Sequence, residues 1–297
     1  MKRPLYFLII FSIVLFACTI STTATPPLVT TAPVISVPPT ATQPPTATQP
    51  PTATELPAAT ETQAATDTPA PQTNATCSEV ELFLDPALAS GFTCQSIPEA
   101  SDTSLPPFAV NPKYTEITLQ GYPLADRMMT PHIDVFPVER YGQLLPDLLP
   151  PLVTTLQSFI GGTAPGSQEL PVLPIQNAGQ LIHVQYQVIP FANGSGTRFL
   201  TEYAQFYDPI NNKDMFFTFQ GLTSDGKYWI SAVLPISNPI LPADGKNPPN
   251  GQSWDDFGNN FPQYINDITT QLNSQPPESF SPTIPMLDAL VASIQIQ

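Results

Sequence analysis

A long segment rich in proline and threonine divides this chain and leaves only the part after it able to fold into a domain. Pro-Thr-Ala-Thr repeats from Pro39, Pro45 and Pro51, and residues 19–76 contain no aromatic residue and no cysteine. Such a segment cannot bury enough apolar surface to offset the entropy that it would lose on ordering. We therefore predict a disordered linker over residues 18–76, followed by one globular domain over residues 77–297.

The first eighteen residues combine a basic start with a short apolar run that ends at a cysteine. Lys2 and Arg3 precede an uncharged run over residues 5–17, which closes on Leu15-Phe16-Ala17-Cys18. A membrane-spanning helix needs about 20 apolar residues, more than this run provides. An ordinary secretory cleavage site, which has small residues at both −3 and −1, is the alternative. With Leu15 at −3, the pattern instead resembles the lipobox signal peptide of bacterial lipoproteins.

This resemblance implies removal of residues 1–17 and acylation of Cys18. The membrane would then be a partner through the lipid anchor, with the domain facing the extracytoplasmic side of the cell membrane or envelope. Two or more acyl chains anchor stably, since each buried methylene contributes about 0.8 kcal/mol. The linker would span about 180 Å as polyproline II or about 45 Å as a flexible coil, and it would clear the lipid headgroups either way. A glycosylated stalk is the alternative to an unmodified linker.

The predicted domain is strongly acidic. Residues 77–297 contain seven basic and 21 acidic residues, which gives a net charge near −14. Nucleic acids and anionic lipid surfaces are bound by clustered Lys and Arg, so this balance argues against both as partners. The charge is typical of a soluble acidic surface, and binding of cations or basic partners is the alternative.

Two cysteines remain once Cys18 is assigned to the lipid. In an oxidising compartment, Cys77 and Cys94 are expected to form a disulfide that closes a short loop, worth about 3 kcal/mol. A metal site built on them would need further ligands nearby, and the sequence has none. We therefore predict neither a metal nor a cofactor.

Hydrophobic periodicity predicts an α+β domain with a central antiparallel β-meander packed against helices. Asp225-Gly226 is a strong signal for a hairpin turn within this meander. Strands are expected over residues 114–119, 132–138, 181–190, 197–207, 215–222 and 227–235. Helices are expected within 144–160, where Pro150-Pro151 suits the first turn and Gly161-Gly162 the end, and over 254–273 and 282–296.

No catalytic constellation stands out. The domain has no Gly-x-Ser-x-Gly motif, and its only histidines, His132 and His183, lie in or beside predicted strands, where we expect structural roles. The oxygen-rich loop over residues 244–256, with Asp244, Asp255 and Asp256, lacks EF-hand spacing and is interpreted as turns, with calcium as the alternative.

The meander carries a cluster of polar and aromatic residues. These residues can be explained as an aromatic core with cross-strand packing. Alternatively, they form a ligand-binding surface in which Arg198 and Gln220 are polar anchors. The candidate ligand-binding residues are Arg198, Tyr203, Gln220, Tyr228 and Trp229. We expect a non-catalytic binding or scaffolding domain for an unknown extracytoplasmic protein or small molecule. The alternatives are an extracytoplasmic hydrolase and a structural accessory subunit of an envelope complex.

Several sequence blocks carry a further resemblance. Residues 173–178, 191–194, 198–201, 203–205, 219–226 and 232–235 resemble an uncharacterised family of exported bacterial lipoproteins, over residues 77–297. The meander and the closing stretch over residues 286–296 are similar to PsbP-like α/β/α sandwich proteins. The first resemblance implies export without an activity, and the second implies only a fold, because a shared fold does not carry function.

Overall fold

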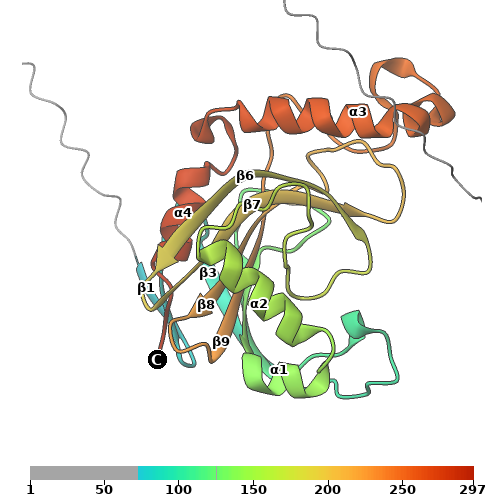
Figure 1. Cartoon of the computed structure of the whole chain (residues 1–297). Helices are drawn as coiled ribbons and strands as arrows, with labels where there is room; N and C mark the ends of the chain where they lie inside the picture. The colour runs from blue at the N-terminus through green and yellow to red at the C-terminus, as the bar shows by residue number, and fades with distance from the viewer. Residues whose placement is uncertain (1–72, 125) are drawn as a thin grey trace, which may run out of the picture. The chain divides into compact units, whose positions relative to one another are not determined.

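The computed structural model describes residues 73–124 and 126–297, which form an α+β domain (Figure 1). Four α-helices and ten strands lie within these ranges, and the strands pair antiparallel throughout. The predicted fold class is therefore confirmed. The expected signal peptide, Cys18 and the linker up to residue 72 lie outside the described residues.

Seven strands form the main sheet, in the order β3-β4-β5-β9-β8-β7-β6. Strands β6 to β9, the last four of this sheet along the chain, are neighbours in it, which confirms the predicted meander. Gly226, in the turn between β8 and β9, has a φ of 71°, a conformation that glycine adopts without steric cost. The strands are β3 (Gly91–Ile97), β4 (Tyr114–Gln120), β5 (His132–Pro137), β6 (Gly179–Phe191), β7 (Gly194–Ala204), β8 (Phe216–Thr223) and β9 (Tyr228–Pro235).

In a smaller sheet, two strands from the start of the domain pair with a strand from its end. Its strands are β1 (Thr73–Cys77), β2 (Val80–Leu84) and β10 (Gln295–Ile296), in the order β1-β2-β10. Strand β1 thus starts at Thr73, four residues before the predicted domain boundary at residue 77. A disulfide joins Cys77 of β1 to Cys94 of β3, with 5.6 Å between their Cα atoms. The expected cysteine pair therefore ties the small sheet to the main one.

The helices pack in two pairs on the two faces of the main sheet. Helices α1 (Val138–Leu144) and α2 (Leu149–Ile160) share a core with Leu222 and Trp229. Helices α3 (Trp254–Asn273) and α4 (Ile284–Ala292) share a core with Phe217 and Phe219. Figure 1 shows α3 crossing over β6 and β7, with α2 lying apart from it. None of the described helices is long and apolar enough to cross a membrane.

One predicted helix has the observed bounds, and the other two differ from the structure at their ends. Helix α3 has the predicted bounds, and Ser253 caps it by accepting a hydrogen bond from the Asp256 N–H at 3.1 Å. Helix α2 starts at Leu149, with Pro150 and Pro151 in its first turn as predicted, whereas Leu144 ends a separate helix, α1, that the sequence did not predict. The expected last helix ends at Ala292, after which the chain enters β10.

Candidate functional site

The five candidate ligand-binding residues lie on opposite faces of the main sheet. Tyr203, Gln220 and Trp229 face α1 and α2, whereas Arg198 and Tyr228 face α3 and α4. They therefore do not line a common site.

Gln220 and Trp229 form a polar network inside the core. Trp229 Nε1–H donates to Gln220 Oε1 at 2.7 Å, and the Leu173 N–H donates to the same oxygen at 3.0 Å. The Gln220 amide donates in turn to Ser231 Oγ at 2.9 Å. Gln220 and Trp229 are both fully buried, so their polar atoms serve each other and not a ligand.

Arg198 is also occupied by the protein itself. Only 4% of the residue is exposed, and its Nε–H donates to Asp288 Oδ1 of α4 at 3.0 Å. Its terminal nitrogens donate to Asp288 Oδ2 at 3.1 Å, to Gln187 Oε1 at 2.7 Å and to the Gln185 carbonyl. These contacts lie within the protein and join β7 to α4, so Arg198 holds α4 against the sheet.

The two tyrosines have separate environments. Tyr203 accepts a hydrogen bond from Gln180 Nε2 at 2.9 Å, and its ring stacks on Phe216 with 6.2 Å between centroids. Tyr228 is half-buried at the start of β9, where it packs against the core on the other face.

Neither histidine is placed as a catalytic base. His132 Nδ1 lies 2.6 Å from the Thr130 carbonyl, and its Nε2 is 3.6 Å from Asp134 Oδ2. His183 Nε2 lies 3.0 Å from the Gly166 carbonyl. Neither of these histidines is paired with a nucleophilic side chain in the described structure.

The loop over residues 244–256, for which calcium binding was the alternative, does not bring Asp244 and Asp256 together. Asp244 forms an ion pair with Lys246, with 2.6 Å between Oδ2 and Nζ. Asp256 accepts a hydrogen bond from Ser253 Oγ at 2.7 Å, at the cap of α3. These contacts support the interpretation of this segment as turns and a helix cap.

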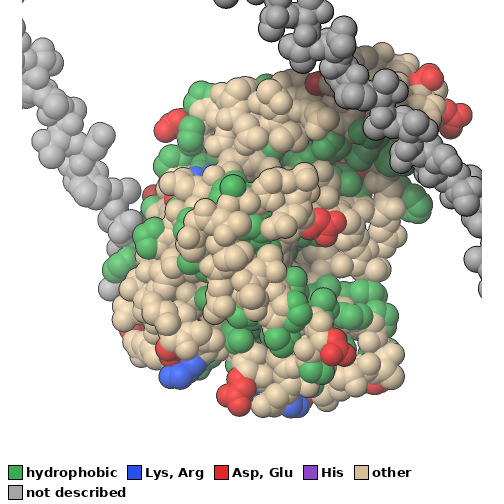
Figure 2. Space-filling view, viewed as in Figure 1, with side chains coloured by type: hydrophobic (Ala, Val, Ile, Leu, Met, Phe, Trp, Pro, Cys, Tyr) green, Lys and Arg blue, Asp and Glu red, His purple; other side chains and the backbone are tan. Residues whose placement is uncertain are grey.

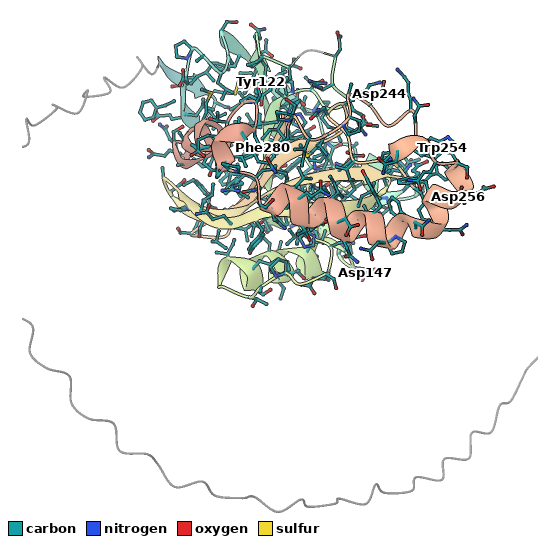
Figure 3. All side chains as sticks on the ribbon, turned by 90° about the horizontal axis from the view of Figure 1, so that it is seen from above. Tyr122, Asp147, Asp244, Trp254, Asp256 and Phe280 are labelled. Carbon is teal, nitrogen blue, oxygen red and sulfur yellow. A yellow bond between two sulfur atoms is a disulfide. The ribbon has the colours of Figure 1, made fainter. Side chains whose placement is uncertain are left out.

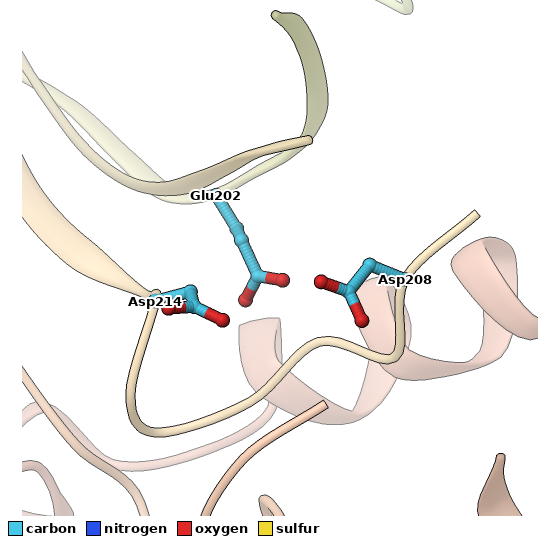
Figure 4. A group of neighbouring side chains, drawn as sticks. All are labelled: Glu202, Asp208 and Asp214. Atoms are coloured by element: carbon cyan, nitrogen blue, oxygen red, sulfur yellow. The ribbon is translucent and has the colours of Figure 1, made fainter. Parts of the chain in front are cut away.

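Three other carboxylates do come together, at the end of β7. Glu202, Asp208 and Asp214 each offer an oxygen within 4.8 Å of the other two, and Figure 4 shows their side chains converging. Glu202 belongs to β7, whereas the other two lie in the loop over residues 205–215 that returns to β8. We call these three residues the carboxylate cluster.

Asn211 holds the carboxylate cluster together. Its backbone N–H donates to Glu202 Oε2 at 3.0 Å, and its side-chain amide donates to Glu202 Oε1 at 3.2 Å and to Asp214 Oδ2 at 3.0 Å. The Asn211 side-chain oxygen accepts from the Lys213 and Asp214 N–H groups. One amide thus shapes the loop and orients two of the three acids.

Burial and mutual repulsion raise the pKa values within the cluster. Burial is the largest cause of the rise in the pKa of Glu202 to about 9, and the charges of Asp214 and Asp208 add to it. The pKa of Asp208 is also raised, by burial and then by the charge of Asp214. At neutral pH, Glu202 is therefore protonated, which relieves the repulsion among the three groups.

A groove of about 770 Å³ opens beside the cluster, with Asp208 and Asp214 in its lining. We call it the aromatic groove. Four of its residues are large hydrophobics that are mostly exposed: Met128 at 65%, Phe206 at 83%, Tyr207 at 61% and Trp254 at 49%. Figure 3 shows Trp254 at the end of α3. The aromatic groove is lined by Met128, Tyr203, Ala204, Gln205, Phe206, Tyr207, Asp208, Lys213, Asp214 and Trp254.

Two rings of α3, buried Phe257 and half-buried Phe261, support two of the exposed rings. The Tyr207 ring lies 4.9 Å from that of Phe261, and the Trp254 ring lies 5.9 Å from that of Phe257. A Cβ atom at Gly258 would come within 3.1 Å of the Tyr207 ring, so this glycine lets the tyrosine lie against α3. The aromatic groove is therefore supported by the core beneath it.

The arrangement is suited to binding more than to proton transfer. Glu202, whose pKa is the most raised in the cluster, is fully buried and its carboxyl oxygens face Asn211. It cannot touch a molecule in the groove, as a general acid must. Asp208 and Asp214 are half-buried and line the groove, so they can present negative charge to a ligand.

Sequence reasoning did not single out the carboxylate cluster. Its members are 12 residues apart along the chain at most, yet they meet only because the loop folds back over the end of β7. One signal was available: Glu202 is an acidic residue within a predicted strand, over residues 197–207.

Comparisons with protein-family models, curated proteins and solved structures give no match to this chain. The two resemblances drawn from the sequence therefore stay predictions.

Proposed function

We propose that this protein is a lipid-anchored extracytoplasmic binding protein that takes its ligand in the aromatic groove. The binding role is supported by one observation: exposed aromatic rings, such as Tyr207 and Trp254, and the half-buried carboxylates Asp208 and Asp214 line the same groove. Large exposed apolar groups clustered on a domain are typical of interaction sites. The groove also has the volume of a small-molecule pocket, which usually lies between about 300 and 1,000 Å³.

The proposal favours binding over the hydrolase alternative. A hydrolase needs a general acid or base, or an activated nucleophile, within reach of the substrate. Glu202 is enclosed and both histidines contact backbone carbonyls, so these groups do not supply that function. The aromatic groove also distinguishes the proposal from a purely structural subunit.

The anchor is a separate part of the proposal and rests on the lipobox-like sequence that ends at Cys18. Mass spectrometry of the mature protein tests it directly. We expect an N-terminal fragment that begins at Cys18 and carries acyl chains. An unmodified Thr19 or an intact Met1 at the N-terminus would contradict the anchor and leave the binding role untouched.

Thermal-shift screening of the purified full chain tests the binding role. Cationic, anionic and neutral small molecules are added to the wild type and to the Tyr207→Ala/Trp254→Ala variant. We expect at least one class to raise the melting temperature of the wild type alone. Leu105→Ala is the matched control, because Leu105 is 48% exposed and lies outside the groove. Equal shifts for wild type and the double variant would place binding elsewhere.

A further inference from the structure

The aromatic groove combines exposed aromatic rings with carboxylates that lack a basic partner, and this combination indicates the class of its ligand. Resting on the proposed function, we propose that the groove binds a small organic cation, with its ammonium group against Tyr207 and Trp254 and near Asp208 and Asp214.

The exposed rings supply the first half of the recognition. A cation within about 6 Å of an aromatic face is attracted by the ring quadrupole, most strongly over tryptophan, and each such contact is worth about 0.5–2 kcal/mol. Tyr207 and Trp254 are 61% and 49% exposed, and both belong to the groove lining. Their support by Phe261 and Phe257 reduces the cost of ordering them around a ligand.

The carboxylates supply the second half. None of the ion pairs in the described part of the chain involves Glu202, Asp208 or Asp214. With Glu202 protonated, Asp208 and Asp214 remain as the charged members of the cluster, and the charge of Asp214 raises the pKa of Asp208. A positive charge placed beside these two carboxylates lowers their repulsion. A ligand cation in the groove therefore fills an electrostatic role that no described side chain fills.

Lys213 lines the groove but does not take that role. The pKa of Asp244 is lowered chiefly by hydrogen bonds from Lys246, and the charges of Lys246 and Lys213 add to this effect. The charge of Lys213 therefore lowers the pKa of Asp244, whereas no basic residue is among the causes of the pKa shifts of Asp208 and Glu202. The rest of the molecule agrees with a cationic ligand, since its net charge is −15 and Figure 2 shows only scattered basic side chains on one face.

Isothermal titration calorimetry with a matched pair of probes tests this inference on the purified full chain. Choline carries a quaternary ammonium, and 3,3-dimethylbutan-1-ol has nearly the same shape without the charge. We expect choline to bind and the neutral probe to bind at least about tenfold more weakly. Trp254→Ala should weaken choline binding by roughly 2- to 30-fold, the range of one cation–π contact. Asp214→Asn should also weaken it, and added salt should reduce the affinity.

Other outcomes overturn the inference. Equal binding of the two probes would leave a binding groove that does not select charge. Binding of calcium alone, unchanged by Trp254→Ala, would assign the carboxylates to a metal ion. Absence of saturable choline binding up to tens of millimolar would also contradict it. The proposed function has its own test. It is contradicted if no class of molecule in the thermal-shift screen raises the melting temperature of the wild type more than that of Tyr207→Ala/Trp254→Ala.

Discussion

Asn211 contacts Glu202 through two hydrogen bonds, one from its backbone N–H at 3.0 Å and one from its side-chain amide at 3.2 Å. Both residues are fully buried. The loop that carries Asp208 and Asp214 is thereby attached to the end of β7. Because the loop also forms one wall of the aromatic groove, this contact links the stability of the domain to the shape of the groove.

Replacing Asn211 should destabilise the domain. Asn211→Ala removes the side-chain donor to buried Glu202 and to half-buried Asp214, and an unsatisfied buried acceptor costs about 1–3 kcal/mol. We expect a loss of about 2–4 kcal/mol in the free energy of unfolding, measured by urea denaturation. Asn260→Ala is the control, because Asn260 donates a single exposed hydrogen bond to the Asp256 carbonyl. Equal effects of the two substitutions would contradict the structural role of Asn211.

The raised pKa of Glu202 predicts a pH dependence of stability. With a folded-state pKa of about 9 and a usual value of 4.5, the folded protein holds a proton that the unfolded chain loses between these pH values. Stability should therefore fall as pH rises through this window, by at most about 1.4 kcal/mol per pH unit from this group. Asp208, Asp214 and Tyr264 are the titratable groups that interact with Glu202.

Glu202→Gln removes that proton equilibrium and serves as the test. We expect the unfolding free energy of the variant, measured by urea denaturation from pH 6 to pH 9, to fall less steeply with pH than that of the wild type. Parallel curves for the two proteins would show that Glu202 is not the titrating group.

The Arg198–Asp288 pair should contribute to stability and not to binding. Asp288→Ala leaves the Arg198 guanidinium enclosed without its counter-charge, and we expect a loss of about 3 kcal/mol in the free energy of unfolding. Arg198→Met/Asp288→Leu should recover much of this loss, because it removes both charges and keeps apolar volume. Glu99→Ala, which breaks the exposed pair with Arg140, should change stability little. Failure of the double substitution to recover stability would argue for a further role of Arg198.

The Cys77–Cys94 disulfide should stabilise the junction of the two sheets. It closes a segment with a sequence separation of 17, for which loop-closure entropy predicts about 3 kcal/mol. We expect Cys77→Ser/Cys94→Ser to lose about that amount in chemical denaturation without added reductant. A double variant as stable as the oxidised wild type would contradict this role.

The sequence predicted well those elements whose partners are close along the chain. Two of the three links between the meander strands are short turns, such as the one at Asp225-Gly226, and α3 has an apolar stripe, so local periodicity was enough. The small sheet was missed because β2 pairs with β10, near the other end of the domain, and β10 has only two residues. Short strands with distant partners leave little local signal.

The candidate site was harder to predict than the fold. Arg198, Gln220 and Trp229 were singled out as polar or aromatic residues in strands, but residue type alone does not reveal that their partners are Asp288 and each other. The carboxylate cluster depends on a loop path that Asn211 determines through contacts spread over several residues. Its position next to exposed rings of α3 appears only in three dimensions.

Tryptophan fluorescence gives the most direct test of the aromatic groove as the ligand site. The chain has two tryptophans: Trp254 is 49% exposed in the groove, and Trp229 is fully buried in the core. We predict that acrylamide quenches Trp254 in the free protein, that choline protects it in a saturable way, and that Trp254→Phe abolishes this change. Choline binding detected by calorimetry without any protection of Trp254, or with the same response in Trp254→Phe, would contradict the account.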